Sequence, residues 1–476
     1  MEKFRKNPLI IIVTTVFIDL LGFSIVIPIL APLLALPYQS ALLPDTAYDQ
    51  RLVIFGFLIA SYAIAQFFGA PILGQLSDRF GRKPILGISL IGTFVARILF
   101  IYGIVVANLP LLFFSRILDG ITGGNISIAQ SAIADITTKE NKAKNFGLIG
   151  AAFGLGFVIG PWLGGKLGDS GLITSLAQTL PSWIASSSTL PLWFATILCL
   201  LNIIAFYFLF PETIKEKIKN KFVFFKAITN TISAFKVPKM RVTLATLFLF
   251  TLGFTFFTQF LSVYVGGKFE NEIKQTVDTK IANGDIKIAI PESISQIPVP
   301  QVKDQAIAKY KEGVTMGFYE AESQSRSSDL FSYIGIWVVI AQGFVVRQLS
   351  KRFKSTTLLK WGLILNAASA LIFLIPNQFS MLFFIVPLFA LSNGLLSPNL
   401  QAIISNSADE KSQGEALGGS QSIQSLAQAI PPIVSGYVAS VSLNLPIVLS
   451  SGLTFLSFLV FALFFKAKSK EILHEE

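Results

Sequence analysis

Long apolar runs are the feature that most constrains this chain. Of its 476 residues, 53% are hydrophobic and only 14% are charged, whereas a soluble domain carries about a quarter charged residues. A membrane helix needs roughly 20 apolar residues. Runs of that length predict spans near 8–34, 51–75, 84–106, 109–134, 143–167, 190–210, 242–266, 329–350, 356–376, 379–405, 414–439 and 444–466. We therefore expect an all-α membrane protein.

Lysines and arginines concentrate in alternate connections between these spans, around 79–83, 139–144, 215–241 and 347–354. Short loops rich in Lys and Arg stay on the cytoplasmic side. We therefore expect both termini to be cytoplasmic. The net charge of +11 lies mainly in such loops, so the expected partner is anionic lipid in a bilayer and not nucleic acid.

One short basic loop, Gly74 to Pro84, reads GQLSDRFGRKP between two apolar runs. A connection this short makes the flanking helices antiparallel neighbours. The phrase returns in degenerate form as QLSKRFK over 348–354. A loop repeated in two halves of a membrane chain is typical of an internally duplicated transporter.

These motifs resemble the loop between helices 2 and 3 of the major facilitator superfamily, G-x-L-x-D-R-x-G-R-[KR]. The resemblance implies twelve membrane helices in two pseudo-symmetric six-helix bundles. It also implies that this loop and an acid at the end of helix 4 gate the cytoplasmic side. The corresponding residues are Gly74, Asp78, Arg79, Gly81, Arg82, Lys83 and Asp135. From position alone, Asp135 is expected to meet Arg79 or Arg82, unless it is an ordinary solvated helix-end acid.

The expected domains are a first bundle over 1–210, a basic linker over 211–241, a second bundle over 242–466 and a cytoplasmic tail over 467–476. The linker is expected to contain an amphipathic stretch on the membrane surface. The second bundle carries an extracytoplasmic insert over 267–329, which is longer than the connection typical of the family. The insert is either a tolerated loop or a small lid or docking element.

Within the apolar runs of the first half, the charged residues Asp19, Arg97, Arg116 and Asp119 lie far from the ends of their spans. A charge within the membrane is costly unless it is paired or hydrated, so it marks a candidate proton or ion site. Arg116 and Asp119 are three apart and share one helix face. Arg97 is expected either to pair with Asp19 or Asp119 or to snorkel toward the membrane surface. The competing interpretation is a structural set of ion pairs and hydrogen bonds. The family resemblance associates Arg116 with proton coupling.

The run from Gly156 to Gly165 contains G-x-x-x-G-P-x-x-G-G. Glycines at four-residue spacing let helices approach closely, so a packing seam is one interpretation. The run also resembles the motif found chiefly in antiporters of the superfamily, whose residues here are Gly156, Gly160, Pro161, Gly164 and Gly165. That resemblance favours export.

The second half offers neutral polar side chains within its spans. We expect a substrate cavity lined by Gln259, Tyr333, Trp337, Gln342, Asn393, Gln421 and Gln424, with hydrogen bonding between helices as the alternative. Gln428 shares one helix face with Gln421 and Gln424 and is expected to line the cavity with them. Ala96 stands where the tetracycline exporters, which the first half most resembles, carry an aspartate. This difference argues against tetracycline itself as the substrate.

Other chemistry finds little support in the sequence. Cys199 lies in an apolar run and His474 lies in the tail, so no metal cluster or nucleophile–base set is expected and the chain is not expected to be an enzyme. No cofactor is predicted besides the coupling proton, and we expect a monomer in the inner membrane of a bacterium.

The sequence therefore predicts a secondary transporter, most simply a proton-coupled antiporter that exports small amphipathic compounds by alternating access. Two alternatives stay open: a proton-coupled importer or facilitator of a sugar, metabolite or peptide, and a non-transporting membrane sensor or assembly protein on the same fold.

Overall fold

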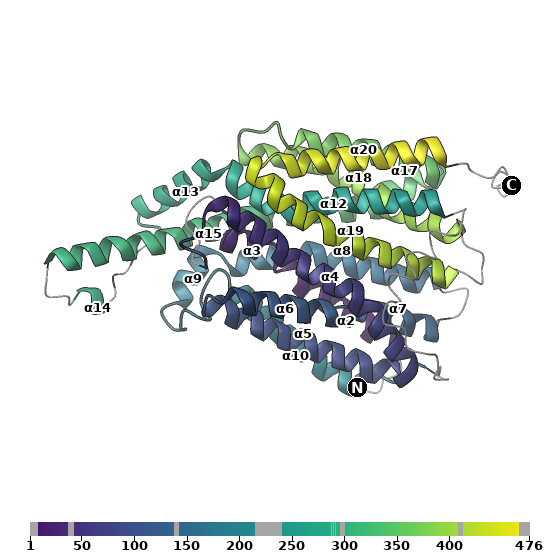
Figure 1. Ribbon diagram of the computed structural model, residues 1–476, viewed down its shortest axis with the longest axis horizontal. Coiled ribbons are helices and arrows are strands. Elements are labelled where there is room, and N and C mark those ends of the chain that lie inside the picture. Colours follow the sequence, from purple (N-terminus) through teal and green to yellow (C-terminus); the bar gives the residue numbers. More distant parts are fainter. Residues whose placement is uncertain are drawn as a thin grey trace.

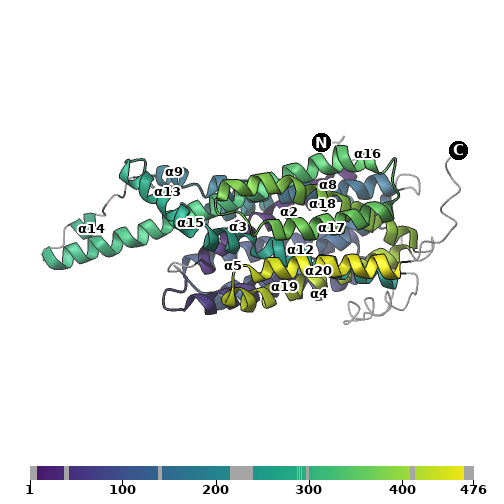
Figure 2. The same ribbon diagram turned by 90° about the horizontal axis from the view of Figure 1, so that it is seen from above.

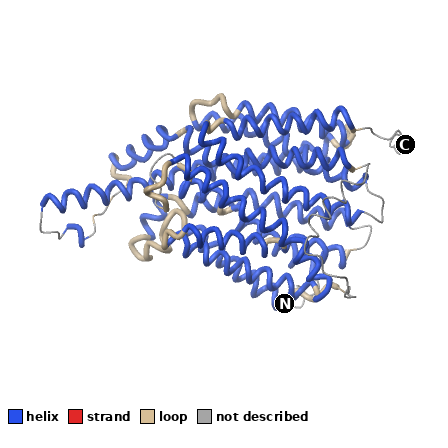
Figure 3. Tube along the Cα trace, viewed as in Figure 1, coloured by secondary structure: helices blue, strands red, loops and turns tan. Residues whose placement is uncertain are grey.

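The computed structural model describes residues 8–36, 42–137, 142–214, 240–286, 288, 290, 292–295, 300–407 and 413–465. Within these ranges the regular structure is helical, without strands (Figure 3). Among the described residues, nine helices are long and apolar enough to cross a membrane. The three remaining predicted spans coincide with α6 and α7 together, α8 and α19.

The first half consists of α2 (Pro8–Ser24), α3 (Ile27–Leu34), α4 (Tyr48–Phe80), α5 (Arg82–Val105), α6 (Leu109–Thr122), α7 (Asn125–Ile136), α8 (Lys142–Leu167), α9 (Ser170–Leu176) and α10 (Leu190–Leu209). The second half consists of α12 (Arg241–Lys268), α13 (Glu270–Ala282), α14 (Glu292–Ser295), α15 (Pro300–Ile340), the π-helical turn Ala341–Val346, α16 (Arg347–Leu349), α17 (Ser355–Ile372), α18 (Leu382–Ser407), α19 (Gln413–Val441) and α20 (Leu445–Phe464). The linker over 215–239 lies outside the described residues.

The long helices run roughly along the longest axis of the molecule (Figure 1). We call the end where α4 passes into α5 at Gly81 the loop end, and the end that carries α13 the insert end. The start of α2 and the end of α20 both lie at the loop end, on the right of Figure 1. The insert projects beyond the bundle at the opposite end in both side views (Figure 2).

Two predicted spans are interrupted. The first divides into α2 and α3 around Ile25 and Val26, with Pro28 in the first turn of α3. The fourth divides into α6 and α7 at Gly123 and Gly124. Proline lacks a donor and glycine is conformationally permissive, so both are common where membrane helices break beside a cavity.

The eighth predicted span is not a separate helix. It begins within α15, a helix of 41 residues that starts in the insert and runs into the bundle, and it continues through the π-helical turn Ala341–Val346 into α16. The insert is therefore built partly from a direct extension of a bundle helix.

The hydrophobic cores show how the two halves meet. At the loop end each half has its own core, one around Ile12, Leu86 and Ile133 and the other around Leu244 and Leu359. At the insert end the two halves share a core. In it, Phe55 of α4 packs edge-on against Phe260 of α12, with ring centroids 5.3 Å apart.

Close backbone contacts between the two halves also lie toward the insert end. An added Cβ on Gly436 of α19 would lie 2.7 Å from the carbonyl oxygen of Leu52 on α4, and one on Gly56 would meet the carbonyl oxygen of Pro432. All four residues lie toward the insert end of their helices. The halves are thus in contact at the insert end and keep separate cores at the loop end.

Candidate functional site

A cavity of about 160 Å³ lies between the two halves. Its first-half lining comes mainly from α2 and α4, and its second-half lining comes from α12 and α19. The lining residues are Asp19, Leu20, Phe23, Val26, Ile27, Leu30, Ile59, Tyr62, Ala63, Gln66, Arg116, Ile126, Phe254, Thr255, Thr258, Gln259, Gln424 and Gln428.

Asp19 is the carboxylate of this cavity. Its Oδ1 lies 3.6 Å from Nη2 of Arg97, and its Oδ2 accepts a hydrogen bond of 2.8 Å from Nδ2 of Asn125. Arg97 also donates to the carbonyl oxygens of Asp19 and Ala195, at 3.3 and 3.1 Å. Of the two partners that the sequence allowed for Arg97, the structure selects Asp19.

Arg116 and Asp119 form a second pair, with Nη1 3.6 Å from Oδ2. The guanidinium of Arg116 lies 4.6 Å from the ring centroid of Tyr62 and 5.9 Å from that of Phe23. Its Nε is buried and has no hydrogen-bond partner among the described residues. A small pocket of about 20 Å³ beside the cavity is lined by Ala96 and by Arg97, Arg116 and Asp119.

Local sequence explains how these charges come together. A Cβ on Gly22 would collide with the guanidinium of Arg97, so glycine at this position lets Arg97 reach α2. The break at Gly123 and Gly124 turns the chain before Asn125, whose amide then reaches Asp19. The sequence analysis did not identify Asn125 as a site residue, although its place directly after two glycines was a usable signal.

The second-half wall of the cavity is neutral. Gln259 and Gln424, both predicted, are among its lining residues. Gln428, expected on the same helix face as Gln424, lines it as well. Thr255 and Thr258 also line it, and their role could not be predicted without knowing the rotation of α12. Amides and hydroxyls can hydrogen-bond a ligand without requiring a compensating charge.

The other predicted cavity residues lie elsewhere. Tyr333 and Trp337 pack against each other with ring centroids 6.2 Å apart, in a core of the second half. Gln342 lies in the exposed part of the π-helical turn, and Asn393 donates to the carbonyl oxygen of Phe389 at 3.4 Å. None of these four lines the 160 Å³ cavity. The side chain of Gln421 lies outside the described residues.

Arg82 lies at the centre of a cluster of polar residues at the loop end. Its side chain is 7% exposed and forms two ion pairs, from Nη1 to Oδ1 of Asp78 at 2.5 Å and from Nε to Oδ2 of Asp135 at 3.0 Å. It also donates to Oγ of Ser77 at 2.7 Å. Of the two arginines considered for Asp135, the structure selects Arg82, while Arg79 is exposed and lies over the Phe80 ring.

Glu212 and Thr213, which follow α10 in the chain, also belong to this loop-end cluster. Glu212 accepts hydrogen bonds from the backbone N–H groups of Arg82 and Lys83, at 2.9 and 3.2 Å. Thr213 donates to Asp135 at 3.3 Å. Sequence reasoning missed both, because nothing in the linker indicates that its first residues return to the loop.

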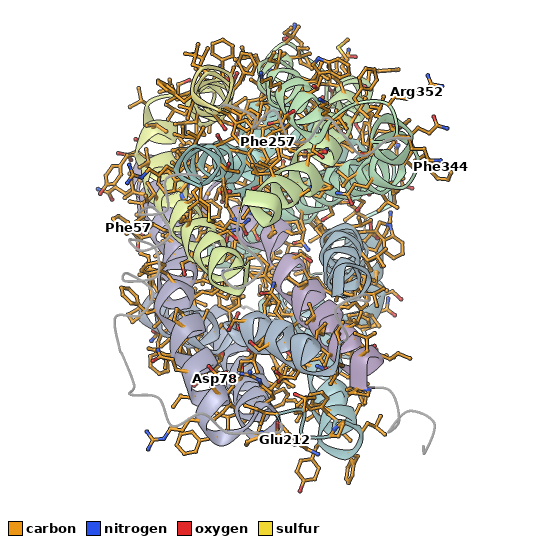
Figure 4. The ribbon with its side chains drawn as sticks, turned by 90° about the vertical axis from the view of Figure 1, so that its right-hand side faces the viewer. Phe57, Asp78, Glu212, Phe257, Phe344 and Arg352 are labelled. Atoms are coloured by element: carbon orange, nitrogen blue, oxygen red, sulfur yellow. The ribbon has the colours of Figure 1, made fainter. Side chains whose placement is uncertain are left out.

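The predicted loop over 74–84 is shorter in the structure, because α4 extends to Phe80 and α5 begins at Arg82, which leaves Gly81 between them. The two glycines of this stretch differ in their roles. Gly81 has φ of 115°, and a Cβ there would collide with the carboxylate of Glu212. Glycine is therefore needed for both the backbone conformation and the space. Gly74 has only the hydroxyl of Ser127 nearby, 3.8 Å from an added Cβ. All contacts of the loop-end cluster lie within the first half, the lower half in Figure 4, where Asp78 and Glu212 are labelled.

The glycine-rich run predicted from the sequence lies on α8, which continues through Pro161 without a break. A Cβ on Gly156 would lie 2.9 Å from Cβ of Leu20, and one on Gly164 would lie 3.0 Å from the carbonyl oxygen of Ile25. Gly160 also faces the α2 side, where a Cβ would collide with Ser24.

Gly165, the last glycine of this run, faces the second half instead. A Cβ there would collide with Ser328 of α15. The glycine run therefore packs α8 against the helix that carries Asp19 and, at its end, against the opposite half.

Metal chemistry has no visible basis in the described ranges, which contain no group of three or more His, Cys, Asp and Glu side chains able to hold an ion. Cys199 is buried, and His474 lies outside the described residues.

Comparison with known proteins assigns the family. Residues 12–273 and 317–475 match the family model described as Major Facilitator Superfamily. Because the match covers most of the chain, the protein belongs to this superfamily of transporters. The unmatched stretch, 274–316, falls inside the predicted insert.

Similar proteins of known name are resistance proteins. The chain is 29% identical over 442 residues to the class C tetracycline resistance protein of Escherichia coli, and this alignment covers 92% of this chain and 91% of that protein. It is 37% identical over 170 residues to multidrug resistance protein 1 of Bacillus subtilis, covering 36% of this chain and 40% of that protein.

Solved structures agree with the fold. The human organic anion transporter TETRAN aligns with a TM-score of 0.59 at 18% identity, over 96% of this chain and 99% of that one. A D-xylose–proton symporter aligns with a TM-score of 0.63 at 15% identity, over 96% and 98%. These likenesses show the major facilitator fold.

The loop-end cluster predicts unequal effects for its arginines. We expect Arg82→Ala to lower the free energy of unfolding by about 1–3 kcal/mol, because it removes charge-assisted hydrogen bonds to Asp78 and Asp135. The exposed neighbour Arg79→Ala should change it by no more than about 0.5 kcal/mol. Thermal unfolding of the two purified variants in detergent measures the difference, and equal losses would contradict this account of the cluster.

Proposed function

We propose that this chain is a proton-coupled antiporter that exports small amphipathic compounds by alternating access, acting as a monomer without a cofactor other than the coupling proton. The observation that carries the proposal is the position of Asp19. A membrane-buried carboxylate lines the cavity between two helical halves and is balanced by Arg97 and Asn125. Intramembrane acids in such positions are typical of proton relays.

Competition at Asp19 provides the coupling. With its charge balanced by Arg97, the carboxylate can accept either a proton or a donor group of the substrate. Because both use the same oxygen atoms, each weakens the binding of the other, and reciprocal weakening is the thermodynamic requirement for exchange. Asp119 holds Arg116 in place beside the cavity and shares the charge balance of the first half.

Substrate binding combines two unlike walls. The first half supplies charged groups and the rings of Phe23 and Tyr62, while the second half supplies Gln259, Gln424 and neighbouring hydroxyls. Aromatic faces suit planar or apolar parts of a compound, and neutral amides orient its polar groups. This pairing fits amphipathic compounds of varied shape.

The direction of transport is supported by the relatives and by α8. The names of the matched proteins refer to tetracycline resistance and multidrug resistance. The antiporter-type run from Gly156 to Gly165 lies against α2, the helix that carries Asp19. Ala96 lines the small pocket beside Arg97, so this region of the site lacks the aspartate of the tetracycline exporters. We therefore propose efflux of compounds other than tetracycline.

The orientation follows from charge. Basic residues concentrate at the loop end, including Arg79, Lys83, Lys351 and Arg352, which the positive-inside rule assigns to the cytoplasm. We propose that the loop end and both termini face the cytoplasm of a bacterium, across its inner membrane. The two halves share a core at the insert end and have separate cores at the loop end. With the loop end in the cytoplasm, this arrangement corresponds to an inward-facing state.

Labelling of single cysteines tests this orientation. In a Cys199→Ala background, Thr279→Cys on α13 should react with a membrane-impermeant maleimide in right-side-out vesicles. Lys351→Cys, at the opposite end, should react only after the vesicles are made permeable. The reverse pattern would place the insert in the cytoplasm and overturn the proposed orientation.

Proton movement tests the function. Sealed vesicles that contain the purified protein and a trapped pH indicator are exposed to a panel of cationic and neutral amphipathic compounds. We expect at least one compound to trigger proton flux in the wild type, and we expect Asp19→Asn to reduce that flux to the level of protein-free vesicles, because the amide cannot take up the proton.

Asp45→Asn is the matched control, since Asp45 is an exposed carboxylate before α4 and its replacement should leave the flux unchanged. Coupled flux that persists in Asp19→Asn would remove Asp19 from the mechanism. Flux whose direction shows uptake with protons would replace export by import.

A further inference from the structure

The insert is tied to the second half by a network of charged residues. Arg326 of α15 lies 3.1 Å from Glu272 of α13 and 3.2 Å from Glu322 on its own helix. Lys280 of α13 lies 2.8 Å from Glu322. In addition, Glu272 accepts a hydrogen bond of 3.1 Å from the backbone N–H of Phe379, which precedes α18.

These links join three separate segments of the second half: α13, α15 and the connection before α18. Because α15 also continues into the bundle as a single helix, the insert-end part of α15 is a rigid extension of the second half. In both side views α13 lies beside α15 (Figures 1 and 2). Any rocking of the second half must therefore carry this part of α15 with it.

One face of this helical extension is buried against the first half. Gln324 donates to the carbonyl oxygens of Gly164 and Ser187, at 2.7 and 3.0 Å. A Cβ on Gly168 would collide with the amide of Gln324 and lie 2.9 Å from the carbonyl oxygen of Ser187. Glycine at the end of α8 thus permits this contact between halves.

The buried face is polar along its length. We call it the α15 seam, and it consists of Glu320, Gln324, Ser327 and Ser328, each less than 9% exposed. The spacings of three and four residues place all four on one side of the helix. The side-chain oxygens of the two serines and of Gln324 have no hydrogen-bond partner among the described residues.

An opposite charge faces the seam from α4. Arg51 is 4% exposed and Glu320 is 7% exposed, and the two interact electrostatically without forming a direct ion pair in the described structure. Arg51 donates a hydrogen bond of 3.4 Å to the carbonyl oxygen of Leu34. Its Nε and the hydroxyl of Tyr48 are buried without a partner in the described residues.

A permanent packing surface would not be built this way. Each buried polar group without a hydrogen-bond partner destabilises the closed state, and apolar side chains of similar size would close this end more firmly. A surface that alternately packs against the first half and faces water has a different requirement. Its closed state must not be much more stable than its open state, and polar side chains keep the two states close in free energy.

We propose that the α15 seam is the exit gate of the transporter, with Arg51 and Glu320 as its charged latch and the insert as the rigid arm that moves it. This inference rests on the proposed alternating access. In the state described here the gate is closed. When it opens, the seam separates from α4 and α8, and its polar groups line the path by which substrate leaves.

Distances between spin labels test the gate without any transport measurement. Labels are placed at Leu172→Cys on α9 and Thr279→Cys on α13, both exposed, in a Cys199→Ala background. We expect a short distance to dominate in the otherwise unchanged protein. Glu320→Gln and Arg51→Gln should each raise the ratio of long to short distances by about fivefold or more, the range of a typical coupling free energy.

Two further changes separate a latch from a merely structural role. Exchange of the charges, Arg51→Glu with Glu320→Arg, should return the distribution toward the short distance. Gly168→Ala should open the gate by steric pressure on Gln324, and this change also serves if the charge variants fail to fold. Glu312→Gln and Gly313→Ala are the controls, because Glu312 is exposed and an added Cβ on Gly313 meets nothing within 4 Å.

The proposal is overturned if Glu320→Gln, Arg51→Gln and Gly168→Ala all keep the distribution of the unchanged protein, or if the exchanged pair is as open as the single variants. Gate opening in these variants, combined with no proton flux for any compound, would instead contradict the proposed antiport and retain the gate.

Discussion

The pairing of two aspartates with two arginines inside the first half is the constraint on which the rest of the structure depends. A single charge at the centre of a membrane helix costs about 2.5–3.5 kcal/mol on insertion scales, so each of these four residues needs a partner. The structure pairs Asp19 with Arg97 and Arg116 with Asp119. Gly22 leaves the space that the guanidinium of Arg97 occupies, and the break at Gly123 and Gly124 precedes Asn125, which donates to Asp19.

The two halves contribute different chemical groups to the central cavity. Among the described residues that line the central cavity, the charged ones belong to the first half, while the second half contributes amides, hydroxyls and Phe254. A ligand between the two walls therefore meets one charged and one neutral surface. Because the charges are balanced within one rigid half, rocking of the other half does not require an ion pair of the core to break.

The two ends of the molecule use polar contacts in different ways. The Arg82 cluster at the loop end joins segments of the first half alone. The contacts of Gln324 at the insert end join the two halves directly. Hence the loop-end cluster shapes one half, whereas the contacts at the insert end determine whether the halves are closed there.

The sequence was sufficient for features fixed by local composition. Apolar length located the spans, and the loop from Gly74 to Pro84 placed Arg82 and Asp78 together. The sequence left open whether Arg97 would meet Asp19 or Asp119, and it gave no sign that Glu212 would bind the loop. It also placed Tyr333 and Trp337 in a cavity to which Thr255 and Thr258 belong instead. These outcomes depend on the rotation of helices about their axes, which is set by packing against other helices.

The central claim, that proton and substrate compete at Asp19, is tested most directly by counting protons released when a transported compound binds the detergent-solubilised protein. The measurement is made in weakly buffered solution over the acidic to neutral range. We predict that binding releases protons from the wild type within part of this range and releases none from Asp19→Asn. The same release from both proteins, with binding intact, would contradict the claim.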